Sequence, residues 1–287
     1  MLFRSVVNKI GCSLKEDVLR RDFTINALAK SVSTGEIVDY TGGLDDLKNK
    51  KLRVLHENSF IDDPTRIVRG LKFSVRFGFE LEEKTRKLQN EYLDNINYDM
   101  SYKRLKKELI ETFDLNSNLA FEKFINEKIY KLVTPNNVNF PKINIQKLVD
   151  KYVIGQNFDY SPIIWLIYVG VLGDLARIPL TKIEKNILED VPKNLLKTDF
   201  ELYKAFENSR IETVLLYAIL VDESGACRYL DELRYIQISV TGEDLKNLGI
   251  MPSPKYKEIF DSLLKNKLEN TNMTKKDEID FIKHLFL

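Results

Sequence analysis

The stretch DDPTRIVRGLKFSVRFGF, residues 62–79, decides how the fold is interpreted. Apolar residues recur every four positions from Ile67 to Val75, which is the spacing of one helix face. Pro64 suits the first helical position, and Gly78 suits the position that follows a helix end. The stretch therefore predicts a helix that opens at its two aspartates and ends at Gly78.

The same stretch carries a carboxylate and a guanidinium one helical turn apart. Asp63 and Arg66 are neighbours on the surface of a helix, because three residues separate them. Cytosine and adenine each present an amine beside a ring-nitrogen acceptor, which this pair complements. Guanine and uracil present a carbonyl in place of the amine, a mismatch on the order of a few kcal/mol when desolvated. The pair predicts a site that admits C and A and refuses G and U.

An ordinary alternative exists for this pair, in which Asp63 caps the helix and forms a surface ion pair with Arg66. Arg69 and Lys72 continue the three-residue spacing. Because each step turns by about 60° on an ideal helix, Arg69 can share a site with Asp63 and Arg66, whereas Lys72 lies further around.

The segments before this helix have strand character. Residues 23–28 alternate with a period of two, and SVSTGEIVDY at 31–40 predicts a turn and a second strand. LRVL at 52–55 is a third strand candidate, and LDDLKNKK at 44–51 is a short helical piece. The glycines at positions 42 and 43 are interpreted as structural support for the hairpin.

RRDFTINALA at residues 20–29 begins with charged side chains at the mouth of the first predicted strand. Arg21 and Asp22 could hold phosphate and sugar hydroxyl groups together there. Judged alone, the segment equally fits a solvated strand end with an internal ion pair, which is the more common arrangement.

After residue 79 the pattern is helical to the end of the chain. Helices are predicted at 83–93 and 102–113, and the latter holds the basic cluster of Lys103, Arg104, Lys106 and Lys107. TPNNVNFPKIN at 134–144 is the strongest linker signal. The predicted domains are 1–60, 61–133, 134–225 and 226–287.

Composition excludes several classes of protein. The 287 residues contain 44 Lys and Arg against 43 Asp and Glu, so RNA contact is expected only at local basic patches. Two histidines and two cysteines, Cys12 and Cys227, do not supply a zinc site. The apolar run at 162–172 is too short to cross a bilayer and predicts a buried helix. No membrane contact is expected, and a cytoplasmic location is the default.

Four segments in this order resemble the class II RNA nucleotidyltransferases, the family of bacterial tRNA CCA-adding enzymes and poly(A) polymerases. They are RRDFTINAL, DYTGGLDDLKNKKLR, DDPTRIVRGLKFSVRFGF and TGEDLKNLGIMP, and they extend over most of the chain. The resemblance implies an α+β protein, with a small β-rich remnant of a nucleotidyltransferase head followed by an all-α neck, body and tail.

The resemblance also implies roles for single residues. Arg21 and Asp22 would contact the triphosphate and ribose of the incoming nucleotide. Asp63 and Arg66 would act as the amino-acid template for C and A, and Arg69 would support the phosphates or the template. Lys72 stands where the family more often has Arg, so it lacks a bidentate fork. The implied substrates are CTP and ATP, and the implied partner is tRNA or another RNA 3′ end.

Catalysis in this family is two-metal phosphoryl transfer, which needs a glycine-rich loop and an Asp-x-Asp strand that binds Mg²⁺. Neither motif precedes Arg20, so no catalytic residue and no metal ligand is assigned, although Mg²⁺ is implied. We expect the isolated chain to be inactive and a separately encoded head fragment to be a further partner.

The specificity of such an enzyme stays open at this stage. CCA addition is preferred as the common role of the family, and CC-only, A-only and poly(A) synthesis are the alternatives. A hypothesis of another class is a non-catalytic module that binds tRNA through phosphate contacts and shows the corresponding salt dependence.

Overall fold

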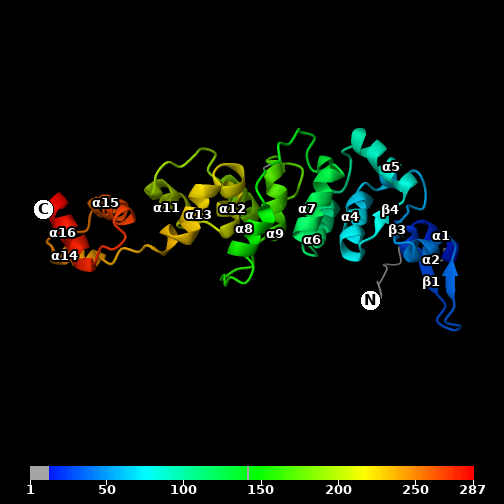
Figure 1. The fold of residues 1–287 in the computed structure, drawn as a ribbon, viewed down its shortest axis with the longest axis horizontal. Coiled ribbons are helices and arrows are strands. Elements are labelled where there is room, and N and C mark those ends of the chain that lie inside the picture. The colour runs from blue at the N-terminus through cyan, green and yellow to red at the C-terminus, as the bar shows by residue number, and fades with distance from the viewer. Residues whose placement is uncertain (1–12, 141) are drawn as a thin grey trace. The chain divides into compact units, whose positions relative to one another are not determined.

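The computed structural model describes residues 13–140 and 142–287 and divides into two compact units. The first unit comprises Met1–Asn139 and Tyr168–Pro179, and the second comprises Phe140–Ile167 and Leu180–Leu287. The described residues are mostly helical with a few short strands near the start, which confirms the α+β class (Figure 1). The division into four domains stays a prediction, and Cys12 and the rest of 1–12 lie outside the described residues.

The first unit opens with a small mixed module. Its elements are α1 (Leu14–Leu19), the 3-10 turn η1 (Thr24–Asn26), β1 (Leu28–Lys30), β2 (Ile37–Asp39), α2 (Gly43–Lys48) and β3 (Lys51–Leu52). The predicted hairpin is confirmed, because β1 and β2 pair antiparallel with Ala29 opposite Val38.

The start predicted for the first strand is wrong. Residues Thr24–Asn26 form a 3-10 turn because the Asp22 carboxylate accepts hydrogen bonds from the Phe23 N–H at 2.9 Å and from the Asn26 amide at 3.0 Å. The third predicted strand is also shorter than expected. Only Lys51–Leu52 form a strand there, which pairs in parallel with β4 (Glu80–Leu81), and Val54 forms an isolated antiparallel bridge with Phe23.

The two glycines hold α2 against the preceding segment. Gly42 has a φ of 78°, in the left-handed region, and a Cβ at Gly43 would lie only 2.3 Å from the Thr24 carbonyl oxygen. The Asp39 carboxylate accepts the backbone N–H groups of residues 41–44. Burial opposes ionisation of Asp39, but these donors outweigh it and lower its pKa.

We predict that Gly43→Ala lowers the free energy of unfolding by about 1–3 kcal/mol, because the new methyl group collides with the backbone. Urea denaturation followed by circular dichroism measures the loss. Gly35→Ala is the control, since Gly35 has a φ of 75° but nothing within 4 Å of a built Cβ. The free energy of unfolding of Gly35→Ala falls by roughly 1 kcal/mol, because only the strain of a left-handed alanine is added. Equal losses in the two variants would contradict the close approach at Gly43.

The helices that follow complete the first unit. They are α3 (Ser59–Asp62), α4 (Thr65–Phe77), α5 (Glu83–Asp94), α6 (Tyr102–Phe113), α7 (Ser117–Asn126) and the 3-10 turn η2 (Ile129–Leu132). The predicted helices at 83–93 and 102–113 are thereby confirmed, and so is the end of the helix predicted at 62–79, because α4 ends before Gly78, whose φ is 68°. Its predicted start at the two aspartates is wrong, because Asp62 belongs to α3 and α4 begins after Pro64.

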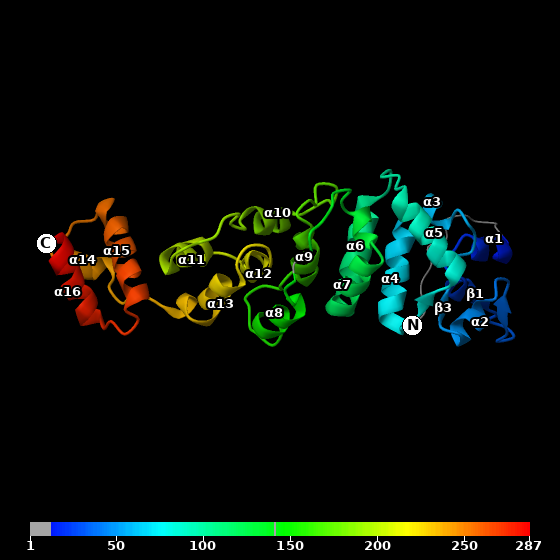
Figure 2. The same cartoon turned by 45° about the horizontal axis from the view of Figure 1, so that its top comes forward.

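Helix α4 packs against α6 (Figure 2), and its Phe73 contacts Phe23 of the RRDFTIN segment, with ring centroids 5.8 Å apart. Ile67 on α4 and Leu105 on α6 are fully buried in this packing. On another side of α4, Gly70 leaves room for the Phe23 ring, whose Cζ would lie 3.1 Å from a Cβ at position 70. These apolar contacts place Arg20–Asp22 beside the charged face of α4.

The regular elements of the described second unit are all helical. They are α8 (Ile145–Tyr152), α10 (Lys182–Glu189), α11 (Asp199–Phe206), α12 (Ile211–Leu220), α13 (Glu223–Asp231), the 3-10 turn η4 (Leu233–Tyr235), α14 (Gly242–Asn247), α15 (Lys255–Glu269) and α16 (Lys275–Phe286). The predicted buried helix at 162–172 is α9 (Ile164–Val169) with the 3-10 turn η3 (Gly170–Leu172), of which residues 168–172 belong to the first unit. No described helix is long and apolar enough to cross a membrane.

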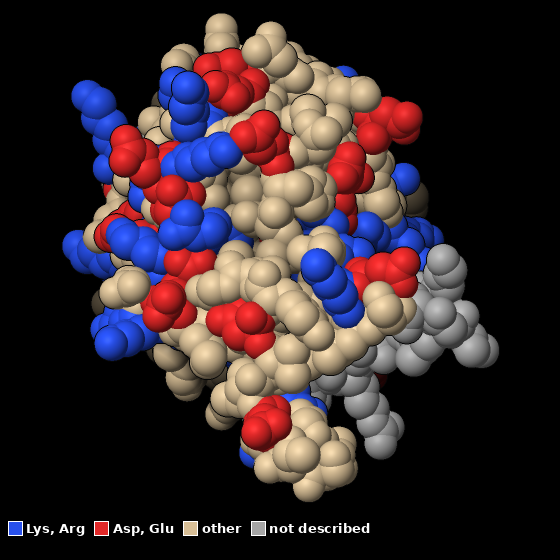
Figure 3. Space-filling view, turned by 90° about the vertical axis from the view of Figure 1, so that its right-hand side faces the viewer, with Lys and Arg blue, Asp and Glu red and all other residues tan. Residues whose placement is uncertain are grey.

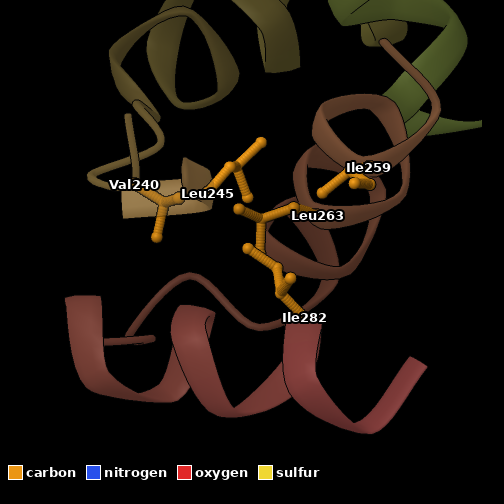
Figure 4. Packing of buried hydrophobic residues seen from close by; sticks show 5 residues of the cluster. All are labelled: Val240, Leu245, Ile259, Leu263 and Ile282. Carbon is orange, nitrogen blue, oxygen red and sulfur yellow. The ribbon is translucent and has the colours of Figure 1, made fainter. Parts of the chain in front are cut away.

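The last three helices share a small apolar core (Figure 4). Its members are Val240, Leu245, Ile259, Leu263 and Ile282. A buried ion pair adjoins this core, in which Lys267 on α15 donates to Glu278 on α16. Glu278 also accepts the backbone N–H groups of Ser239 and Val240, both at 2.9 Å, so one side chain joins α16 to the segment before α14.

Candidate nucleotide-binding site

Arg21 and Asp22 occupy the turn between α1 and η1, and the two have different surroundings. Arg21 donates to Asp17 on α1 at 2.7 Å, and 31% of its side chain is exposed. Hydrogen bonds from Arg21 and from Arg20 lower the pKa of Asp17. Sequence reasoning missed this clamp from α1, which holds the paired arginines near the surface.

Asp22 is 7% exposed and joins the turn to α4. Its Oδ1 accepts from Phe23 N and Asn26 Nδ2, and its Oδ2 accepts from Arg69 Nε at 2.7 Å and Arg69 Nη2 at 2.6 Å. Four donors therefore already satisfy this carboxylate. The structure thus brings Asp22 and Arg69 together, although 47 residues separate them.

Arg69 also reaches α6, where its Nη1 donates to Glu108 at 3.1 Å. Burial disfavours the charged form of Arg69, but Asp22 and Glu108 outweigh this effect and raise its pKa. Lys72, one turn further along α4, is buried, with 9% of the residue exposed. It donates to Glu108 and to Glu111, the latter at 2.7 Å. The hydrogen bond from Lys72 lowers the pKa of Glu111.

Arg66 contacts both α3 and the Arg20–Asp22 turn. Its Nη1 donates to the Ser59 hydroxyl at 2.7 Å, and its Nη2 donates to the Arg20 carbonyl at 3.3 Å. Arg66 and Arg69 therefore each link α4 to the Arg20–Asp22 turn, the first to a carbonyl and the second to a carboxylate.

Asp63 ends α3 and precedes α4, and both of its oxygens have partners. Oδ1 accepts from the Thr65 N–H at 3.1 Å and from the Thr65 hydroxyl at 2.6 Å. Oδ2 accepts from Arg104 Nη2 on α6 at 2.8 Å. The ordinary alternative of an Asp63–Arg66 ion pair is not what the structure shows, because each side chain binds other groups.

The members of the basic cluster on α6 have different partners in the structure. Arg104 binds Asp63, the Lys106 ammonium donates to the Pro179 carbonyl at 3.1 Å, and Lys107 lies 3.8 Å from Glu111. Lys103 is exposed. On the face of the molecule shown in Figure 3, Lys and Arg side chains are interleaved with Asp and Glu side chains.

Sequence reasoning missed Glu108 and Glu111, and it missed that Arg104 pairs with Asp63. The available signal was the spacing of Arg104, Glu108 and Glu111, which lie on one side of a helix. That spacing does not say which helix faces them, so it did not single out α4.

The described residues do not fit a magnesium site. No group of three His, Cys, Asp or Glu side chains in the described part of the chain converges as metal ligands would. Asp46 already binds the Thr24 hydroxyl and Arg53, and Asp62 lies 3.8 Å from His56.

Comparison with known proteins identifies the family. Residues 3–53 match the family described as the Poly A polymerase head domain. An A-adding tRNA nucleotidyltransferase from Halalkalibacterium halodurans is 30% identical over 299 residues, which cover 95% of this chain and 69% of that protein. The chain belongs to the tRNA nucleotidyltransferase family, whose members are enzymes.

Other comparisons agree on fold and show how much of each nucleotidyltransferase is matched. An A-adding tRNA nucleotidyltransferase from Geobacter sulfurreducens is 28% identical over 93% of this chain, which spans 35% of that relative. The structure of a Thermotoga maritima CCA-adding enzyme complexed with tRNA gives a TM-score of 0.76 at 21% identity, covering 94% of this chain and 73% of that one. A CCA-adding enzyme complexed with CTP gives 0.77 at 23% identity, covering 95% and 72%. These two likenesses show a shared fold.

Proposed function

We propose that this chain forms the nucleotide-selecting and RNA-contacting part of a tRNA nucleotidyltransferase that adds C and A to tRNA 3′ ends from CTP and ATP. One observation carries the proposal. Arg66 and Arg69 on α4 both donate to the Arg20–Asp22 turn, and these contacts support a common site for the proposed base, sugar and phosphate contacts. Relatives described as complexed with tRNA and with CTP share the fold and support the proposed ligands.

The hydrogen-bonding capacity left at Asp63 and Arg66 suits the proposed bases. Asp63 Oδ2 receives one donor, from Arg104, and retains one lone pair for a base amine. Arg66 uses three of its five N–H groups on Ser59 and Arg20, so two remain for a ring nitrogen or carbonyl of the base. An acceptor beside a donor is the pattern that cytosine and adenine require.

The other assignments concern the sugar and the phosphates. Among the described residues Arg21 pairs with Asp17, and 31% of its side chain is exposed, so we assign its guanidinium to the triphosphate. Asp22 binds a ribose hydroxyl in this proposal by exchanging the Asn26 amide, because its four hydrogen-bond partners leave no unused lone pair. Arg69 orients Asp22, and the buried Lys72 supports Arg69 through their common partner Glu108.

We propose that the metal-binding carboxylates come from a further head-domain segment, in the same polypeptide or in a separate one. The hairpin and α2 expose several large apolar side chains, namely Val32, Ile37, Tyr40, Leu44 and Leu47. Such a surface suits the addition of further strands. Mg²⁺ would then be bound by that segment, and the proposed location is the cytoplasm.

The test mixes this chain with a head-domain fragment that carries the Asp-x-Asp motif. Incorporation of labelled CTP, ATP, GTP and UTP is measured on tRNA that lacks CCA and on tRNA that ends in CC. We expect C and A to be added, and Asp63→Ala to reduce the preference over G and U by roughly tenfold, the equivalent of about 1.4 kcal/mol. Asp99→Ala is the control, since Asp99 is exposed elsewhere in the first unit.

Each outcome of this test has a definite meaning. Addition of A alone to tRNA that ends in CC would replace CCA addition with A addition as the function. Equal incorporation of all four nucleotides by the unmodified chain would overturn the template role of Asp63 and Arg66. No incorporation with any nucleotide would overturn complementation by a separate fragment.

A further inference from the structure

Arg104 pairs with Asp63, a contact that its membership of the basic cluster on α6 does not explain. Among the residues that contact Asp63, Thr65 is two residues away in sequence, whereas Arg104 comes from α6 and lies 41 residues away. Ser101 is the N-cap of α6, and its hydroxyl accepts a hydrogen bond from the backbone N–H of Arg104 at 3.4 Å. This cap fixes the position of the Arg104 backbone in the first turn of α6. Its guanidinium then meets Asp63 Oδ2 at 2.8 Å.

We propose that Arg104 is a specificity-positioning residue, which fixes the plane of the Asp63 carboxylate so that Oδ2 presents its free lone pair to the amine of cytosine or adenine. The inference rests on the proposed function of Asp63. It assigns to Arg104 a role in nucleotide selection in place of the RNA phosphate contact expected from the sequence.

An Asp carboxylate has a defined orientation only when both of its oxygens are held. The terminal torsion of an Asp side chain is broad, so one anchored oxygen does not fix the direction of the other. Thr65 anchors Oδ1 through its N–H and its hydroxyl, and Arg104 anchors Oδ2. With both oxygens held, the remaining lone pair of Oδ2 has one direction. Selection against a base carbonyl depends on that direction, because the penalty arises when two acceptors face each other.

The exposure of the two partners agrees with a positioning role. The side chain of Arg104 is 59% exposed and that of Asp63 is 19% exposed. An ion pair with so exposed a member contributes little to stability. Arg104 is also suited to share Oδ2 with a ligand, since a single Nη approaches that oxygen and leaves space for a second donor.

The experiment measures binding of ATP, CTP, GTP and UTP to the full chain by equilibrium dialysis. Arg104→Ala is compared with Lys87→Ala, which removes a charge of the same sign from an exposed position of α5 outside the candidate site. We expect Arg104→Ala to reduce the preference for ATP and CTP over GTP and UTP by about tenfold, and Lys87→Ala to leave it unchanged. A loss of folded protein lowers binding of all four nucleotides in the same ratio, so the preference itself separates positioning from structural damage.

A double variant makes the assignment stricter. If Arg104 acts through Asp63, adding Arg104→Ala to Asp63→Ala produces no further loss of preference. An additional loss in the double variant would overturn the inference. So would an Arg104→Ala chain that keeps the full preference and binds tRNA more weakly to the same extent as Lys103→Ala. If the unmodified chain binds no nucleotide, or binds all four equally, the proposed function and this inference are both overturned. If the unmodified chain shows the preference and Arg104→Ala keeps it, only the inference about Arg104 is overturned.

Discussion

Replacing Glu108 with alanine lowers the free energy of unfolding of this chain by about 3 kcal/mol, because breaking a buried ion pair leaves uncompensated charge. Glu108 is 9% exposed and lies between Arg69 and the equally buried Lys72. Asp22 still faces Arg69 and Glu111 still faces Lys72, which keeps the loss at the lower end of the range for such changes. Urea denaturation followed by circular dichroism measures it.

Two further variants test the cause of that loss. Glu111→Ala is the matched control on α6, since 44% of the Glu111 side chain is exposed, and its loss stays below about 1 kcal/mol. The double variant Lys72→Met with Glu108→Leu removes the buried cation together with its partner and recovers part of the stability. Equal losses for Glu108→Ala and Glu111→Ala would contradict a buried network centred on Glu108.

Replacing Glu278 with alanine has an effect of similar size in the C-terminal helices, about 3–5 kcal/mol. Glu278 is fully buried, and its removal leaves Lys267, 6% exposed, without its partner. The N–H groups of Ser239 and Val240 lose their acceptor as well. We expect faster amide hydrogen exchange at these two positions and a lower unfolding midpoint.

The control for this change is Asp280→Ala. Asp280 lies on the same helix, is 58% exposed and is 3.9 Å from Lys283, so its loss is close to zero. Glu278→Gln keeps an oxygen that can accept the two N–H groups, and it therefore protects their exchange better than alanine does. Unchanged exchange at Ser239 and Val240 in the alanine variant would contradict the role of Glu278 in holding this segment.

Local rules predicted the elements of the candidate site well. Four-residue apolar spacing and Gly78 predicted α4, and a polar turn between two extended runs predicted the β1–β2 hairpin. The error at residues 24–26 came from a side chain, because Asp22 draws Phe23 N and Asn26 into a turn where alternation alone indicated a strand.

The arrangement of charges around α4 followed less from sequence. Its spacing indicated that Lys72 turns away from Asp63, and the structure places Lys72 against two carboxylates of α6. The same spacing could not indicate that Arg104 would reach Asp63. The ligand contacts of these residues stay predictions.

The sequence by itself determined the bounds of α5 and α6, the end of α4, the position of the hairpin and the order of motifs that resembles the family. These features depend on hydrogen bonds and side-chain spacing within a few residues, which the order of amino acids specifies directly. Only the tertiary structure decided which charged side chains pair with one another. Asp22 meets Arg69 and Asp63 meets Arg104 across 47 and 41 residues, because apolar packing sets the facing sides of α4, α6 and the turn before η1.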